Sequence, residues 1–166
     1  MPTITLSTGS LHTYGISRVF ELAAEAGFEA IEILIDHRWD SRQPAYLRRL
    51  SRDSGLPIVA VHSPFVPHVP GWPTEPLERL RRSVALAREL EAGIVVTHLP
   101  FRIHGIRIEF LGFSKRLMLL PLPLPVSDDY GCFLQNGLAR FEDEEGVRVG
   151  VENMPAKQIL GRRVEI

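Results

Sequence analysis

The chain has 166 residues, 45% of them hydrophobic and 23% charged, with a formal net charge of -1 at pH 7. This composition is typical of a globular domain with a hydrophobic core, and it gives no indication of the basic surface that nucleic acids require. The only cysteine, Cys132, excludes an intrachain disulfide and suits a reducing compartment, so we expect a cytoplasmic protein. We expect neither a secretory signal at Met1 nor a membrane span, because the most apolar run, 117–126, is short and interrupted by prolines.

The first strand and the first helix are predicted from a change of hydrophobic period. Residues 3–7 have the pattern of a strand, and the loop after them holds His12 and Tyr14. From Ile16 the apolar residues recur at helical spacing, and Gly27 ends this helix in a left-handed conformation. His12 is therefore a loop residue, which either faces a site or is simply solvated.

Residues 30–35 are nearly all apolar, as expected of a strand that is covered on both faces in a parallel sheet. Glu32 is the exception, because an unpaired carboxylate is costly to bury. We weigh two roles for Glu32 equally, an acceptor for substrate hydroxyl groups inside a barrel or an ion pair with Arg148. A second helix is predicted from Pro44 at its first position to Gly55 after its last.

A third strand, 58–62, follows at once, and the loop after it carries His68 and Trp72, a mixture suited to the mouth of a pocket. Thr74 is the predicted N-cap of a third helix, which Gly93 ends. The arginines of this helix are interpreted as a solvated face, namely Arg79, Arg81, Arg82 and Arg88.

A fourth strand is predicted at 94–98, and the pattern then loses its period over about 101–126. Because this stretch is longer than an ordinary loop, we interpret it as an irregular insertion. One further helix leads through Gly146 into a fifth strand at 147–151. Residues 1–166 are thus predicted to form a single partial domain.

Three of these strands end in the same way, on a side chain that can bind a metal, with a proline within the next three residues. They are His62 before Pro64, His98 before Pro100 and Glu152 before Pro155. Because parallel strands gather their carboxyl ends at one rim, where such folds bind ligands, we predict that these side chains converge on a divalent cation. Two imidazoles and one carboxylate suit zinc, manganese or iron better than calcium, which prefers oxygen ligands. The alternative is that each histidine is a neutral, hydrogen-bonded group.

Strands and helices alternate along the whole chain, and their order predicts the class of fold. No glycine-rich nucleotide-binding motif opens a helix, so an α/β fold of the (β/α) TIM-barrel type is favoured over a doubly wound nucleotide-binding sheet. A closed barrel has eight βα units in about 250 residues, whereas about five units are predicted here. We favour an incomplete, truncated copy of a longer protein. The alternatives are an open sheet, or a homo-oligomer or partner chain that covers the exposed sheet edges.

The strand ends resemble those of the xylose isomerase-like TIM-barrel superfamily, which contains sugar and sugar-phosphate isomerases and epimerases and the endonuclease IV family. The matching segments are Gly27-Phe28-Glu29-Ala30-Ile31-Glu32-Ile33, Val61-His62-Ser63-Pro64, Thr97-His98-Leu99-Pro100 and Val151-Glu152-Asn153. The resemblance implies that Glu152 is a metal ligand, and the endonuclease-like branch implies the same for His62 and His98. The isomerase branch relies on further ligands from strands six to eight, which the predicted five strands do not include.

From this resemblance we expect a divalent-metal-dependent sugar or sugar-phosphate isomerase or epimerase, inactive alone if strands six to eight are required. Glu152 would bind the metal and move a proton at the carbon beside a carbonyl, with Glu32 as a second catalytic carboxylate. The residues expected to contact the sugar are His12, His68, Trp72 and Asn153. Two alternatives are an endonuclease IV-like metal-dependent phosphodiesterase and a non-catalytic half-barrel remnant.

Overall fold

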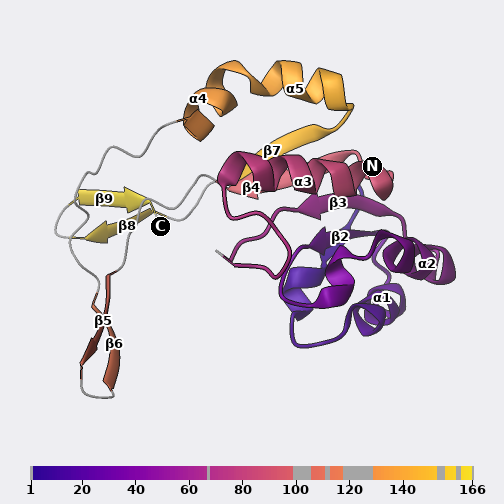
Figure 1. Ribbon diagram of the computed structural model, residues 1–166. Helices are drawn as coiled ribbons and strands as arrows, with labels where there is room; N and C mark the ends of the chain where they lie inside the picture. The colour runs from indigo at the N-terminus through magenta and orange to yellow at the C-terminus, as the bar shows by residue number, and fades with distance from the viewer. Residues whose placement is uncertain are drawn as a thin grey trace.

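The computed structural model describes residues 2–66, 68–98, 106–110, 113–117, 129–152, 156–159 and 162–165 of the chain. Its central feature is a parallel five-stranded sheet in the order β1-β2-β3-β4-β7 (Figure 1). The strands are β1 (Thr5–Ser7), β2 (Ala30–Leu34), β3 (Ile58–His62), β4 (Ile94–His98) and β7 (Arg148–Glu152). Each strand lies beside the one that precedes it in this sheet, and helices connect them, which is the winding of a (β/α) barrel. The predicted α/β fold, a partial TIM barrel with five parallel strands, is confirmed.

Helices connect successive strands of the sheet, and shorter elements lie in the loops. The helices are α1 (Ile16–Glu25), α2 (Pro44–Ser54), α3 (Pro76–Glu89), α4 (Asp129–Asn136) and α5 (Leu138–Glu145). Figure 1 shows α1 and α2 side by side, and α3 packs along β3 and β4. The loops after β1 and β2 contain the 3-10 helices η1 (Thr8–Leu11) and η2 (Trp39–Arg42). Two antiparallel hairpins form separate sheets, β5 (Ile106–Phe110) with β6 (Phe113–Leu117) and β8 (Ala156–Ile159) with β9 (Arg162–Glu165).

Glycines in the left-handed region follow three of the helices. Gly27, Gly55 and Gly146 have φ angles of 78°, 74° and 70°, a conformation that is strained for residues with a Cβ atom. The helix ends predicted at these three glycines are therefore confirmed. Because the chain must reverse its direction after each helix to enter the next strand, these glycines set where β2, β3 and β7 begin.

The two ends of α3 differ from the prediction. Glu75, not Thr74, is the N-cap, and its carboxylate accepts hydrogen bonds from two backbone N–H groups of the first turn. The cap falls one residue later than predicted because Pro76 takes the first helical position, where the missing N–H of proline leaves no bond unmade. At the other end the left-handed residue is Glu91, with a φ angle of 59°, rather than Gly93.

The helical segment before Gly146 also differs from the prediction, and the predicted insertion is described only in part. A single helix was the expectation, but α4 and α5 are separate helices that meet at Gly137. Glycine is the poorest helix former after proline, so a break at this residue is physically reasonable. The insertion at about 101–126 contains the β5–β6 hairpin, and its other residues lie outside the described part of the chain.

The sheet has one face toward the helices and one face that is more open. Ile31, Val61 and Val95 point toward the helices and are fully buried in the hydrophobic core. Glu32 and His62 lie on the opposite face and are half-buried. The prediction that the second strand is covered on both faces is confirmed only in part: no residue of β2 is exposed, but from Ile31 to Leu34 buried residues alternate with half-buried ones. In the described residues, no helix combines the length and the apolar character needed to cross a membrane.

Candidate metal centre

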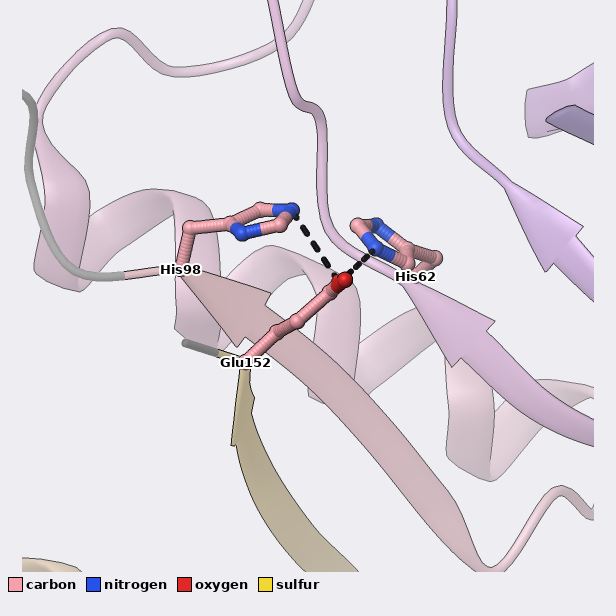
Figure 2. Close-up of side chains that lie close together, drawn as sticks. All are labelled: His62, His98 and Glu152. Atoms are coloured by element: carbon pink, nitrogen blue, oxygen red, sulfur yellow. Dashed lines mark hydrogen bonds and ion pairs between the residues drawn. The ribbon is translucent and has the colours of Figure 1, made fainter. Parts of the chain in front are cut away.

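The three predicted ligands are each the last residue of a strand. His62 ends β3, His98 ends β4 and Glu152 ends β7. His98 and Glu152 are paired in register, and His62 is paired with Val96, which lies two residues before His98. Because side chains two residues apart on a strand share a face, this register places the three side chains on the same face. Figure 2 shows them pointing toward one another from the strand ends.

The potential ligand atoms lie close to one another. The Oε2 atom of Glu152 is 3.2 Å from Nε2 of His62 and 3.6 Å from Nε2 of His98. One potential ligand atom from each of the three residues lies within 4.8 Å of the other two, a spacing that a single cation can bridge. The structure thus brings the three side chains together, and their binding of a metal stays a prediction.

A backbone contact defines which nitrogen of His62 is available. The Nδ1 atom of His62 lies 2.8 Å from the carbonyl oxygen of Ser63, and a carbonyl oxygen can only accept, so Nδ1 carries the proton. In the neutral imidazole, Nε2 then presents a lone pair to the Glu152 carboxylate. Two acceptors at 3.2 Å repel each other unless a cation, either a proton or a metal ion, lies between them. Fixing the ring through its other nitrogen is how proteins orient metal-binding histidines.

His98 has the surroundings of a neutral imidazole. Both of its ring nitrogens are buried without a hydrogen-bond partner among the described residues. Burial lowers the pKa of His98, the nearby His62 lowers it further, and Glu152 opposes both effects. Phe65 packs its ring edge-on against His98, with the ring centroids 5.2 Å apart. A neutral, desolvated histidine beside a carboxylate is well suited to bind a metal.

The loop after β3 is held by α3, a connection that was not predicted. The Arg79 guanidinium donates hydrogen bonds to the carbonyl oxygens of Pro64, Val66 and Pro73 at 3.2–3.4 Å. The Ser83 hydroxyl lies 3.2 Å from the Ser63 hydroxyl in the buried interior. The interpretation of Arg79 as part of a solvated face is therefore wrong, because its side chain is hydrogen-bonded to the loop that carries Phe65.

Glu32 lies on the same face of the sheet as the ligands. It is half-buried on β2 and is paired in register with Ala60, two residues before His62. The alternative role in an ion pair with Arg148 is wrong: Arg148 lies 3.5 Å from Glu142, and two strands separate β2 from β7. The role of Glu32 toward a substrate stays a prediction.

The predicted sugar-contacting residues are distributed over several places. His12 lines a hollow between the loops that follow β1 and β2, and His68 is exposed on the loop after β3. Trp72 is buried, with the Arg82 guanidinium 5.5 Å from the centroid of its ring. Asn153 lies outside the described residues. The structure does not bring His12, His68 or Trp72 into the cluster of His62, His98 and Glu152.

Comparison with curated proteins finds relatives in mycobacteria. The chain is 33% identical over 118 residues to the uncharacterized protein Rv0498 of Mycobacterium tuberculosis, which covers 70% of this chain and 41% of that protein. It is also 33% identical over 100 residues to the uncharacterized protein ML2432 of Mycobacterium leprae, which covers 60% of this chain and 36% of that protein. The chain therefore spans only about two-fifths of the length of the curated relatives that it matches.

Comparison with solved structures finds the same fold in larger proteins. A D-tagatose 3-epimerase-like protein superposes with a TM-score of 0.56 at 22% identity, covering 96% of this chain and 56% of that chain. The 3-keto-D-glucoside 4-epimerase of E. coli superposes with a TM-score of 0.52 at 18% identity, covering 84% and 51%. An AP endonuclease, family 2, from Brucella melitensis gives a TM-score of 0.55 at 16% identity, covering 92% and 56%. At such identities the likeness establishes the fold alone.

A family model assigns the chain more directly than any single relative does. The model described as xylose isomerase-like TIM barrel matches residues 20–165, which include β2, β3, β4, β7 and all three potential ligands. The match agrees with the observed winding of the parallel sheet and with the structural likeness to epimerases and to an AP endonuclease. The chain belongs to the xylose isomerase-like TIM barrel family.

Proposed function

We propose that this chain carries the metal centre of a divalent-metal-dependent sugar or sugar-phosphate isomerase or epimerase, with His62, His98 and Glu152 as ligands. The observation that carries the proposal is the contact between Glu152 and the Nε2 atoms of the two histidines, at 3.2 and 3.6 Å. The other nitrogen of His62 is engaged by the Ser63 carbonyl, and the pKa of His98 is lowered by burial. A lone pair of His62 is therefore directed at the Glu152 carboxylate and Nε2 of His98 lies beside it, an arrangement that a divalent cation would stabilise.

The donor set indicates the class of metal. Two imidazole nitrogens and one carboxylate oxygen suit Zn²⁺, Mn²⁺ or Fe²⁺, and three protein ligands leave further coordination positions for a substrate. When bound, the ion would polarise the oxygens of a hydroxycarbonyl compound and so acidify the C–H bond beside the carbonyl. The side chain of Glu152 is 54% exposed, so the centre is accessible from the open face of the sheet.

Two carboxylates are candidates for moving the proton. A sugar isomerase or epimerase removes a proton from the carbon beside a carbonyl and returns a proton to the neighbouring carbon or to the opposite face. Glu152 would serve mainly as a ligand, because a carboxylate that neutralises a metal is a weaker base. Glu32, on the same face of the sheet, would accept a hydrogen bond from a substrate hydroxyl group or take a proton from a substrate carbon. The contacts of His12, His68, Trp72 and Asn153 with the sugar stay predictions.

The runner-up function is that of an endonuclease IV-like, metal-dependent phosphodiesterase. The presence of two histidines among the three ligands favours it, because imidazole-rich centres suit zinc and phosphodiester hydrolysis. The net charge of -1 opposes it, since a DNA-binding face needs several cations to neutralise the phosphates. The isomerase or epimerase function is therefore preferred.

The test is proton exchange at a sugar carbon. The full chain, loaded with Mn²⁺ or Zn²⁺, is incubated in D₂O with a neutral ketohexose or its phosphate, and deuterium beside the carbonyl is followed by NMR. We expect incorporation with the wild type and a loss of about a hundredfold or more in Glu152→Gln and Glu32→Gln. Glu144→Gln, which changes an exposed carboxylate paired with Arg140, is the matched control. A loaded wild type that exchanges no faster than Glu152→Gln would contradict the proposal.

A further inference from the structure

The hollow lined by His12 lies on the same rim of the sheet as the metal centre. The loops that follow β1 and β2 border this shallow, open hollow of about 430 Å³, lined by His12, Tyr14, Arg38, Trp39 and Asp40 among others. These loops follow the carboxyl ends of their strands, as the ligand residues do in β3, β4 and β7. The Thr8 hydroxyl accepts a hydrogen bond of 2.8 Å from the backbone N–H of Leu34, which is paired with His62. This bond attaches the loop after β1 to the end of β2, the strand beside β3, so the hollow and His62 belong to the same rim of the sheet.

Two aromatic residues line the hollow and are unusually exposed. Tyr14 is 48% exposed and Trp39 is 68% exposed, although both are large and partly apolar. Such surface is unfavourable in water, and aromatic residues with a polar edge are typical of binding sites that take partly apolar ligands. Their position on one concave surface distinguishes them from exposed hydrophobic residues that are scattered singly, such as Ile4.

The floor of the hollow is held by a network of hydrogen bonds. The Arg38 guanidinium binds both carboxylate oxygens of Asp36, at 2.6–3.0 Å, and donates to the carbonyl oxygens of Tyr14 at 3.0 Å and Thr8 at 3.1 Å. The Asp40 carboxylate accepts a hydrogen bond of 3.2 Å from the backbone N–H of Ile16 at the start of α1. The two loops are thus bound to each other, so the backbone segments that carry Tyr14 and Trp39 are preorganised, which reduces the entropy lost on binding.

The charges in the hollow select against a phosphate group. Every nitrogen of the Arg38 guanidinium already has a partner, and its charge is neutralised by Asp36. Asp40 adds a negative charge to the lining. A phosphate bound here would face a carboxylate and would find the guanidinium occupied, which is unfavourable. A neutral ligand with hydroxyl groups would instead find a carboxylate oxygen and an imidazole as hydrogen-bond partners.

We propose that Tyr14 and Trp39 form a subsite for a neutral sugar ring, with His12 and Asp40 as partners for its hydroxyl groups. A pyranose ring has a face of C–H groups that packs on aromatic rings and an edge of hydroxyl groups that needs polar partners, and the hollow offers both. The proposal rests on the proposed function and narrows it, because it selects a non-phosphorylated sugar or glycoside as the substrate class.

The experiment uses the indole N–H signals of the ¹⁵N-labelled full chain, treated with chelator. The chain has two tryptophans, of which Trp39 is exposed in the hollow and Trp72 is buried elsewhere. On titration with methyl α-D-glucopyranoside we expect the Trp39 signal to move and the Trp72 signal to stay, with a dissociation constant on the order of millimolar. Trp39→Ala assigns the signal, and glucose 6-phosphate is expected to bind more weakly than the neutral glycoside.

Substitutions of exposed residues separate the subsite from the metal centre. Tyr14→Ala is expected to weaken glycoside binding by roughly fivefold or more, and the matched control Ile4→Ala, also exposed, is expected to leave it unchanged. His98→Ala is expected to abolish metal binding and to leave glycoside binding intact. No shift of the Trp39 signal up to about 50 mM glycoside, tighter binding of the phosphate, or full affinity in Tyr14→Ala would each overturn the subsite. Absence of metal binding by the wild type would overturn the proposed function alone.

Discussion

The contact of Glu152 with two imidazole nitrogens is unfavourable in the neutral, metal-free state. Nε2 of His62 directs a lone pair toward the carboxylate, because Nδ1 donates to the Ser63 carbonyl. Neither ring nitrogen of His98 has a hydrogen-bond partner among the described residues. A cation between these atoms converts the repulsion into attraction. The carboxylate of residue 152 should therefore strengthen metal binding and should not stabilise the metal-free protein.

Replacing Glu152 with glutamine tests this reasoning at one residue. In Glu152→Gln the amide can donate to Nε2 of His62 and the repulsion is removed, so the free energy of unfolding of the metal-free protein should rise by about 1 kcal/mol or less. The affinity for Zn²⁺ should fall by more than about a hundredfold, because a ligand and its charge are lost. Calorimetric titration and urea unfolding measure the two quantities. Equal zinc affinity in the two proteins would contradict the assignment of Glu152 as a ligand.

Arg79 and Arg81 are neighbouring arginines of α3 with different surroundings. Arg79 donates to three carbonyl oxygens of the loop after β3, whereas Arg81 forms an exposed ion pair with Glu78. Arg79→Ala should lower the free energy of unfolding by about 2 kcal/mol or more, since it leaves carbonyl groups unpaired. Arg81→Ala should change it by under about 0.5 kcal/mol, because exposed ion pairs contribute little. Urea unfolding compares them, and equal losses would show that the loop does not depend on Arg79.

At the scale of elements, each strand of the sheet separates a packed face from an open one. In β4, Val95 is 0% exposed against the helices, and its neighbour Ile94 is 45% exposed on the other face. The metal centre lies at the carboxyl end of this open face, where the side chains are loosely packed and accessible to a ligand. The helix-facing residues hold the strands, and the strands position the ligands.

Threonine substitutions at adjacent positions of β4 test this division. Val95→Thr should lower the free energy of unfolding by about 2 kcal/mol, because a hydroxyl group is buried among apolar side chains. Ile94→Thr should lower it by under about 1 kcal/mol, since the side chain is exposed and threonine suits a strand. Urea unfolding measures both values. A larger loss for Ile94→Thr would reverse the assignment of the two faces.

The contact between α4 and the sheet predicts that the stability of the protein depends on pH. The buried Tyr130 hydroxyl lies 3.0 Å from the hydroxyl of Thr97, and burial raises the pKa of Tyr130 above its ordinary value although this hydrogen bond opposes the rise. A raised folded pKa means that the contribution of Tyr130 to stability is complete below the unfolded pKa and is lost as pH increases toward the folded pKa. Tyr130→Phe should cost about 1 kcal/mol at neutral pH, through the unpaired Thr97 hydroxyl.

The alkaline part of this prediction is measured by comparing wild type and Tyr130→Phe. Urea unfolding at neutral pH and at about pH 10.5 should give a smaller difference in the free energy of unfolding at the higher pH. Absorbance of the phenolate at high pH measures the titration of Tyr130 directly. A difference that grows with pH would contradict the raised pKa.

At the scale of the whole molecule, the features that depend on local sequence could be predicted. The bounds of β3 and β4 and the stops at Gly27, Gly55 and Gly146 follow from β-branched runs and from glycines that adopt the left-handed conformation. The meeting of His62, His98 and Glu152 also follows, because the carboxyl ends of adjacent parallel strands share one rim.

Features that depend on the path of a loop could not be predicted from the sequence. Arg79 has the spacing of a solvated helix residue, and only the return of the loop after β3 brings carbonyl oxygens to its guanidinium. Similarly, nothing in the sequence pairs Tyr14 with Trp39, which are brought together by the bonds of Arg38 across two loops. The ion pair with Arg148, one of the two roles weighed for Glu32, was wrong because it depended on the distance between β2 and β7, which strand patterns do not specify.

The measurement that tests the central claim most directly is zinc K-edge X-ray absorption of the full chain with one equivalent of Zn²⁺. We predict two imidazole nitrogens at about 2.0–2.1 Å together with oxygen ligands, and loss of the imidazole scattering in the His62→Ala, His98→Ala double variant. A spectrum without imidazole ligands, or one that the double variant reproduces, would contradict a metal centre formed by His62, His98 and Glu152.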